Sequence, residues 1–402
     1  MQYRYRQGLT LILLIAVCAC QFASGQTTTT EQPATDPTNA ETKSEATDNP
    51  SQVDPALHKK TVKAAIEYLL NKGQDRSDGT YSKKFGPAVT SMCTTALLKN
   101  GVPLDHPQIQ KSLQTLESFV QSDGGIYAPN SNLRNYETSV AVMCFAAANK
   151  DDKYDKIIQE AIGFQRNIQW DDGEGHDQAS TFYGGQGYGK HKRPDMSNTS
   201  FFIDALKAAA SEDKDSDSMK KAMQFISRTQ NLVSEHNGME FASKATADDA
   251  GGFIYTPAGK GESKAGDTPE GGLRSYASMT YAGLKSFLYA GLKKDDIRVQ
   301  AAMDWIKRHY DLTTNPGMGK QGLFYYYHVF AKALDANGER FIVDKKDKQH
   351  NWRADLTMEL ASKQKPDGSW INEADRWYES DPNLVTSYAL LALSYCSPAN
   401  DK

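Results

Sequence analysis

The sequence predicts an all-α fold, a closed (α/α)6 toroid of six outer and six inner helices. A unit that occurs six times supports this prediction: an amphipathic helix, a turn rich in Asp and Gly, and a second helix that is apolar on nearly every side. A helix without a polar face is buried on most of its surface, so the second helix of each unit belongs to an inner layer. The terminal units are as apolar as the others, whereas an open array needs polar end repeats, so the ring is expected to close.

The outer helices are predicted from apolar residues at helical spacing, as in Val62, Ile66, Leu69 and Leu70. The other five outer helices are expected near residues 107–121, 152–168, 216–230, 296–309 and 351–364. The inner helices are expected to begin near residues 87, 136, 196, 273, 321 and 383.

The turns between the two helices of a unit combine Asp, which initiates a turn, with Gly, which accepts a positive φ. Such turns are expected at Asp78-Gly79, Asp123-Gly124-Gly125, Asp172-Gly173, Asp249-Ala250-Gly251-Gly252 and Asp367-Gly368, with Asn315-Pro316-Gly317 in unit five. Because the element recurs in every unit, we interpret it as structural rather than catalytic.

The composition gives no electrostatic argument for nucleic acid or an anionic membrane as a partner, because the formal net charge of the 402 residues is only −4. The mean hydropathy is −0.63, and no apolar run after the first 25 residues is long enough to span a bilayer. No His/Cys spacing suggests a zinc site, so we expect neither a metal nor a cofactor.

Residues 1–25 are typical of an export signal: Arg4 and Arg6 precede a short apolar core, and Ala23-Ser24-Gly25 is a small-residue cleavage site. An alternative is lipoprotein processing, with a lipid anchor on Cys20. Residues 26–54 are rich in Thr, Pro and acids and predict a disordered linker, which leaves 55–398 for the toroid. We therefore expect an exported protein, periplasmic or extracellular.

The last turn, Gln364-x-x-Asp367-Gly368-Ser369-Trp370, resembles the QW repeat of squalene–hopene cyclases. The wider pattern, a Gly-rich turn followed by helices with Thr or Ser and then Ala-Leu, is similar to the prenyltransferase and squalene-oxidase repeat. The resemblance covers roughly residues 60–396. It implies a terpenoid cyclase-like toroid with an aromatic-lined central cavity suited to isoprenoid chains.

The resemblance does not extend to the chemistry of these families. Class II cyclases protonate their substrate with the middle acid of an Asp-x-Asp-Asp-Thr run. Here Asp195 and Thr199 match that run, while Ser197 takes the place of the donor and Asn198 that of the last acid. A hydroxyl cannot protonate an alkene, which needs a strong carboxylic acid. The zinc ligands of protein prenyltransferases are also not matched.

Candidate site residues gather near the predicted ends of inner helices. Asp195 and Asn198 begin one inner helix, and Tyr188 lies in a Gly-aromatic loop just before it that we interpret as a lid. An aromatic run begins at Phe324. We expect three of its side chains to line the cavity or, alternatively, to pack between the two layers: Tyr325, Tyr326 and His328.

Two loops supply further candidates. Asp249 is a candidate acid in the longest insertion, and Arg376, Trp377 and Glu379 form a group suited to a sugar or polar headgroup. The alternatives are solvated turn residues for Asp249 and a salt-bridge network between loops for the last three. Asp195, Asp249 and His328 are thus the candidate catalytic residues, and the others are candidates for ligand binding.

Three functions follow from these patterns. The first is an exported cyclase-like toroid that holds an apolar, isoprenoid-type small molecule; if it is an enzyme, the resemblance implies a cyclase or isomerase. The second is a carbohydrate-active lyase or hydrolase, which needs paired carboxylates such as Asp195 with Asp249 or Glu379. The third is a non-catalytic scaffold for a protein partner. We expect a monomer in each case.

Overall fold

The computed structural model describes residues 52–189, 193–209 and 216–401. The predicted export signal, the possible lipid site Cys20 and nearly all of the predicted linker lie outside the described residues. The described part forms a toroid whose ends meet, since the backbone N–H of Val53 donates to Asp401 Oδ2 at 3.0 Å.

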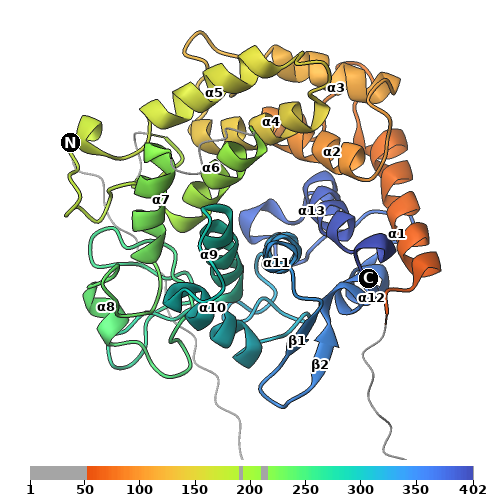
Figure 1. Cartoon of the computed structure of the whole chain (residues 1–402). Coiled ribbons are helices and arrows are strands. Elements are labelled where there is room, and N and C mark those ends of the chain that lie inside the picture. Colours follow the sequence, from red (N-terminus) through yellow and green to blue (C-terminus); the bar gives the residue numbers. More distant parts are fainter. Residues whose placement is uncertain (1–51, 190–192, 210–215, 402) are drawn as a thin grey trace, which may run out of the picture. The chain divides into compact units, whose positions relative to one another are not determined.

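Six helices form the inner ring. They are α2 (Pro87–Lys99), α4 (Arg134–Ala148), α6 (Met196–Ala208), α9 (Ala277–Tyr289), α11 (Leu323–Asn337) and α13 (Pro382–Tyr395). Each packs against the next, and α13 packs against α2 (Figure 1). Asn100 at the end of α2 also donates to Leu390 O of α13 at 2.9 Å. The inner ring is therefore closed.

Six helices surround this ring. They are α1 (Pro55–Tyr68), α3 (Pro107–Glu117), α5 (Asp155–Asn167), α7 (Asp217–Ser227), α10 (Ile297–Arg308) and α12 (Trp352–Lys363). Each contacts an inner helix, and α1 contacts both α12 and α13 of the last unit (Figure 1). The prediction of a closed toroid with six outer and six inner helices is confirmed.

Two short elements depart from the repeat. The helix α8 (Glu240–Ser243) lies in the long insertion before α9, which has a small apolar cluster of its own formed by Phe241, Ala242, Ile254 and Leu273. The strands β1 (Phe341–Val343) and β2 (Gln349–Asn351) form an antiparallel hairpin between α11 and α12. Neither was predicted, because segments this short do not show a hydrophobic period.

A buried threonine in the inner helix fixes the turn in five of the units. In unit six the backbone N–H of Trp370 donates to Thr386 Oγ1 at 3.1 Å. Thr90, Thr138, Thr199 and Thr280 accept equivalent bonds from the residue that follows the turn in their own units. In unit five the turn is held differently, since Asn315 Oδ1 accepts from Ser278 N–H of α9, the inner helix of unit four, at 3.0 Å.

A turn glycine brings the same five turns against the next outer helix. These glycines have φ between +80° and +90°, and a Cβ on any of them would lie 1.8–2.9 Å from backbone atoms of that helix; they are Gly79, Gly124, Gly184, Gly251 and Gly368. In unit three this residue is Gly184, so the turn expected at Asp172-Gly173 was wrong. Gly173 lies in a short 3-10 segment of an inserted loop instead.

A glutamine at the end of an outer helix binds both the turn of its own unit and the next outer helix. Gln364 Nε2 donates to Gly368 O of its own turn and to Thr61 O of α1, both at 3.0 Å. Gln74, Gln169 and Gln230 make the matching pair of bonds in units one, three and four. The bond from Gln364 joins the last unit to the first, and the Trp370 indole N–H donates to Leu360 O at 2.9 Å in the same region.

This packing predicts how a turn glycine responds to substitution. Gly368→Ala places a Cβ 2.2 Å from Ala64 O, whereas Gly291→Ala has a similar φ of +92° with no atom within 4 Å. Both variants bear the strain of a positive φ, and Gly368→Ala adds the clash. We expect the free energy of unfolding in urea to fall by roughly 1–3 kcal/mol more in Gly368→Ala than in Gly291→Ala. Equal losses would contradict the close approach.

Candidate functional site

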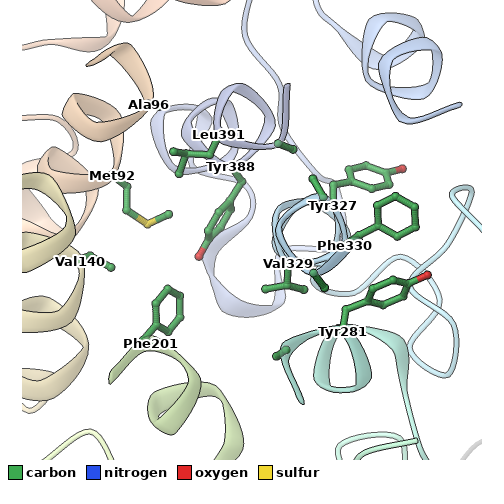
Figure 2. Packing of buried hydrophobic residues seen from close by; sticks show 14 of the residues in the cluster. Met92, Ala96, Val140, Phe201, Tyr281, Tyr327, Val329, Phe330, Tyr388 and Leu391 are labelled. Carbon is green, nitrogen blue, oxygen red and sulfur yellow. The ribbon is translucent and has the colours of Figure 1, made fainter. Parts of the chain in front are cut away.

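The six inner helices enclose a cavity of about 290 Å³ on their common axis. Its lining comes from the middle and C-terminal turns of all six helices, including Met92 of α2, Met143 of α4, Phe201 of α6 and Leu391 of α13. We call it the central cavity. Figure 2 shows Met92, Phe201 and Tyr388 pointing toward one another from three inner helices, whereas Tyr327 and Phe330 point away from them.

A buried group of charged side chains lies at the central cavity. Asp204 Oδ1 is 2.7 Å from Lys285 Nζ, and Asp204 Oδ2 is 2.9 Å from Lys332 Nζ. At most 10% of each of these side chains is exposed. Burial lowers the pKa of Lys285 to about 8. Against the effect of burial, the two ammonium groups lower the pKa of Asp204, and the carboxylate raises that of Lys332.

His328 lines the central cavity from α11, as one of the two interpretations of its segment predicted. Burial, together with the nearby Lys332, lowers its pKa to about 3, so the imidazole is neutral at physiological pH. Its ring packs at 5.8 Å from that of Tyr388, and its Nδ1 atom is buried without a hydrogen-bond partner.

Asp195 and Asn198 lie together at the N-terminus of α6. Asp195 caps the helix, accepting from the backbone N–H of Asn198 at 2.9 Å and from its Nδ2 at 2.8 Å. The Tyr255 hydroxyl also hydrogen-bonds to Asp195. Burial raises the pKa of Asp195 to about 6. The Tyr188 side chain hydrogen-bonds to Asn198 and Tyr255, the two residues that bind Asp195.

Tyr325 connects this group to the axis. Its hydroxyl is 3.4 Å from Ser197 Oγ, and its ring packs near those of Phe201 and Tyr388. These aromatic rings occupy the axis on the side of the central cavity toward the helix N-termini. Thr199, in contrast, is the threonine of unit three that binds the turn, and four other units have a threonine at the equivalent position. Part of the match to the cyclase run therefore belongs to the repeat itself.

The candidate acids on the loops bind backbone. Asp249 Oδ1 accepts from Ser275 N–H at 2.8 Å, and Oδ2 accepts from the Thr246 hydroxyl at 2.6 Å. Glu379 is buried and accepts from Tyr325 N–H at 2.8 Å and from Asn372 Nδ2 at 2.6 Å. Glu379 therefore caps α11, and neither carboxylate faces the central cavity.

The remaining candidates lie apart from the central cavity. The Tyr326 hydroxyl donates to Asp311 O at 2.7 Å, and its ring packs between the layers against Tyr281. Arg376 lies over the Trp377 ring and donates to Gln321 Oε1 at 2.6 Å. The catalytic or binding role of each candidate residue stays a prediction.

The sequence reasoning missed Asp204, Lys285 and Lys332. Each interrupts an apolar run of an inner helix, as in Phe201-Phe202-Ile203-Asp204. A charged residue in a buried helix is expected to be paired or functional, so this signal was present in the sequence.

The described ranges contain neither a cluster of metal ligands nor a membrane-spanning helix. No group of three or more His, Cys, Asp or Glu side chains there could hold a metal ion. No helix in the same ranges is long and apolar enough to cross a bilayer. Cys93, Cys144 and Cys396 are buried free thiols.

Residues 87–247 match the family model described as the squalene-hopene cyclase C-terminal domain. No curated protein matches the chain in sequence. The matched region runs from the start of α2 into the insertion before α9, and it includes Asp195 and Asp204.

Solved structures match over nearly the whole toroid. A variant of the type II terpene cyclase MstE from Scytonema, in complex with the product merosterolic acid A, is 14% identical, with a TM-score of 0.51 and 86% of this chain and 98% of that chain covered. Another variant of MstE, in complex with the substrate geranylgeranyl dihydroxybenzoate, is 15% identical. Its TM-score is 0.51, and the match covers 86% of this chain and 97% of that chain. A D-mannose isomerase is 10% identical, with a TM-score of 0.54 and coverage of 86% and 98%. At these identities the similarity establishes the fold.

The buried position of Asp195 predicts a pH dependence of stability. The folded protein binds a proton at Asp195 up to about pH 6, whereas the ordinary pKa is 3.8. The stability from this group is present below pH 3.8 and is lost as the pH rises through 6, by about 3 kcal/mol. Asp195→Asn removes this titration. The free energy of unfolding of the variant, minus that of the wild type, should therefore increase from pH 4 to pH 7. A difference that does not change with pH would contradict the account.

Proposed function

We infer that this chain, a member of the terpenoid cyclase-like toroid superfamily, holds an apolar, isoprenoid-type ligand in its central cavity. The observation that carries this inference is the apolar wall of that cavity, formed by side chains such as Met92, Val140, Phe201 and Leu391 from four inner helices. Relatives of the same fold bind a geranylgeranyl substrate and a terpenoid product. The volume of about 290 Å³ is near the lower limit of about 300–1,000 Å³ for ligand pockets, which favours a short isoprenoid.

We do not propose cyclisation by protonation of an alkene. Ser197 stands where the resemblance places the proton donor, and its hydroxyl is too weak an acid. Asp195 is buried and engaged by Asn198 and Tyr255. These observations favour ligand binding as the primary role.

The carbohydrate-active alternative has weaker support. It requires two free carboxylates that face each other across an open cleft. Asp249 and Glu379, the proposed partners of Asp195, both use their oxygens to bind backbone N–H groups and neighbouring side chains. The similarity to D-mannose isomerase concerns the fold.

Native mass spectrometry of the full chain, purified from its own cells, tests the proposal. We expect a bound mass that organic extraction removes. Ala147 lines the central cavity and is exposed at its edge, so Ala147→Trp should narrow the cavity without overpacking the core and should abolish the bound mass. Ala56→Trp, on the exposed side of α1, is the matched control and should retain it.

The outcomes are distinct. A bound apolar molecule that is lost in Ala147→Trp alone supports the proposal. An unliganded protein that instead copurifies with a second polypeptide would contradict it and favour a scaffold role. A bound sugar would favour the carbohydrate alternative.

We also propose that the protein is exported, on the basis of the charged start, apolar core and small-residue site in residues 1–25. The mature N-terminus tests this. Mass spectrometry should find a chain that begins at Gln26. A chain that begins at a lipid-modified Cys20 would establish the lipoprotein alternative, and an intact Met1 in the cytoplasm would refute export.

A further inference from the structure

The central cavity holds more positive than negative charge. Lys99 and Lys207 lie on its lining together with Lys332, and Lys285 pairs with Asp204 behind it. Asp204 is the one carboxylate in the described lining. Asp335, one turn after Lys332, is paired with Arg353 at 2.9 Å. Three ammonium groups therefore line the cavity, the exposed Lys99 and Lys207 and the buried Lys332, and the carboxylate of Asp204 is shared by Lys332 and Lys285.

This imbalance is costly where it is buried. Lys285 and Lys332 are 1% and 10% exposed, and both share the carboxylate of Asp204. One carboxylate cannot neutralise two ammonium groups, and an uncompensated charge is costly in a buried site. Lys285 also donates to Ser200 O at 3.4 Å, whereas Lys332 lies on the cavity. An anion in the cavity would supply the missing charge.

The charged residues of the lining lie toward the C-terminal ends of their helices. On α2, Met92 is followed seven residues later by Lys99, which lies about 10 Å further toward the C-terminal end of the helix. The order is the same on α6, where Phe201 precedes Asp204 and Lys207. The inner part of the cavity is thus apolar, while its open end is basic.

The lysines at and behind the cavity also lie near aromatic rings. The ammonium groups of Lys207, Lys285 and Lys332 all lie 5.8–5.9 Å from the centre of the Tyr289 ring. The Lys99 ammonium lies 5.8 Å from the Tyr395 ring. Lys207 and Lys332 thus lie near one tyrosine of the lining and Lys99 near another, so three cavity lysines from three inner helices border the same space.

We propose that the ligand of the central cavity is an amphiphilic anion: a short isoprenoid or similar apolar chain among Met92, Val140 and Phe201, bearing a carboxylate or phosphate bound by Lys332, Lys99 and Lys207. This inference rests on the proposed function and specifies the chemical class of the ligand.

Isothermal titration calorimetry of the full chain with three matched probes tests the proposal. Geraniol is neutral, while geranic acid and geranyl phosphate add a carboxylate or a phosphate to the same chain. A charge-assisted bond should make at least one of the anionic probes bind roughly tenfold or more tighter than geraniol. The tighter of the two identifies the anionic group.

Two variants and a control locate the site. Lys332→Met keeps the length of the side chain and leaves Lys285 to pair with Asp204; the double variant Lys99→Ala/Lys207→Ala changes the open end alone and does not disturb the buried pair. We expect each to reduce the preference for the anionic probe several-fold. Lys59→Met, on the exposed surface of α1, should leave it unchanged.

The outcomes separate this inference from the proposed function. Equal binding of geraniol and both anions would overturn the anion site and leave the apolar ligand intact. A preference for the anion that survives in both lysine variants would also overturn the assignment. Failure of all three probes to bind would contradict the anion site and the proposed function together.

Discussion

The close approach of each turn glycine to the next outer helix is the constraint on which the toroid depends. Gly368 lies against Ala64 of the first unit, so the contact that stacks neighbouring units also joins the two ends of the array. Closing the ring directs one face of all six inner helices toward a common axis. Aromatic side chains such as Tyr325 and Tyr388 fill that axis near the helix N-termini, while small residues such as Ala147 leave it open near the C-termini.

Most of the fold could be predicted from the sequence because the same pattern of two helices and a turn occurs six times. A helix that is apolar on all sides and a helix with one apolar face can pack together in few ways. The register of unit three could not be predicted in this way. The inserted loop contains a second Asp-Gly pair at Gly173, and only the contact with α7 distinguishes Gly184 as the turn glycine. The β1–β2 hairpin is too short to carry a period.

The candidate site was less predictable, because side-chain direction within a buried helix depends on packing. Tyr325 and Tyr326 are adjacent and chemically alike, yet one lies on the axis and the other between the layers. The match to the cyclase run predicted Asp195, at the N-terminus of α6, as a site residue. Asp204 lies nine residues later in the same helix. A charged residue among the apolar residues of a buried helix was a signal for the central cavity that the sequence already contained.

The central claim is that the axis of the ring holds an amphiphilic anion with its charged group toward the helix C-termini. The most direct measurement is a crystal structure of the full chain soaked with 10-bromodecanoic acid, with the bromine located by anomalous scattering. The account predicts the bromine among Met92, Val140 and Phe201, with the carboxylate within hydrogen-bond distance of Lys332 Nζ. Bromine bound elsewhere while the central cavity stays empty, or a carboxylate turned toward Tyr325, would contradict it.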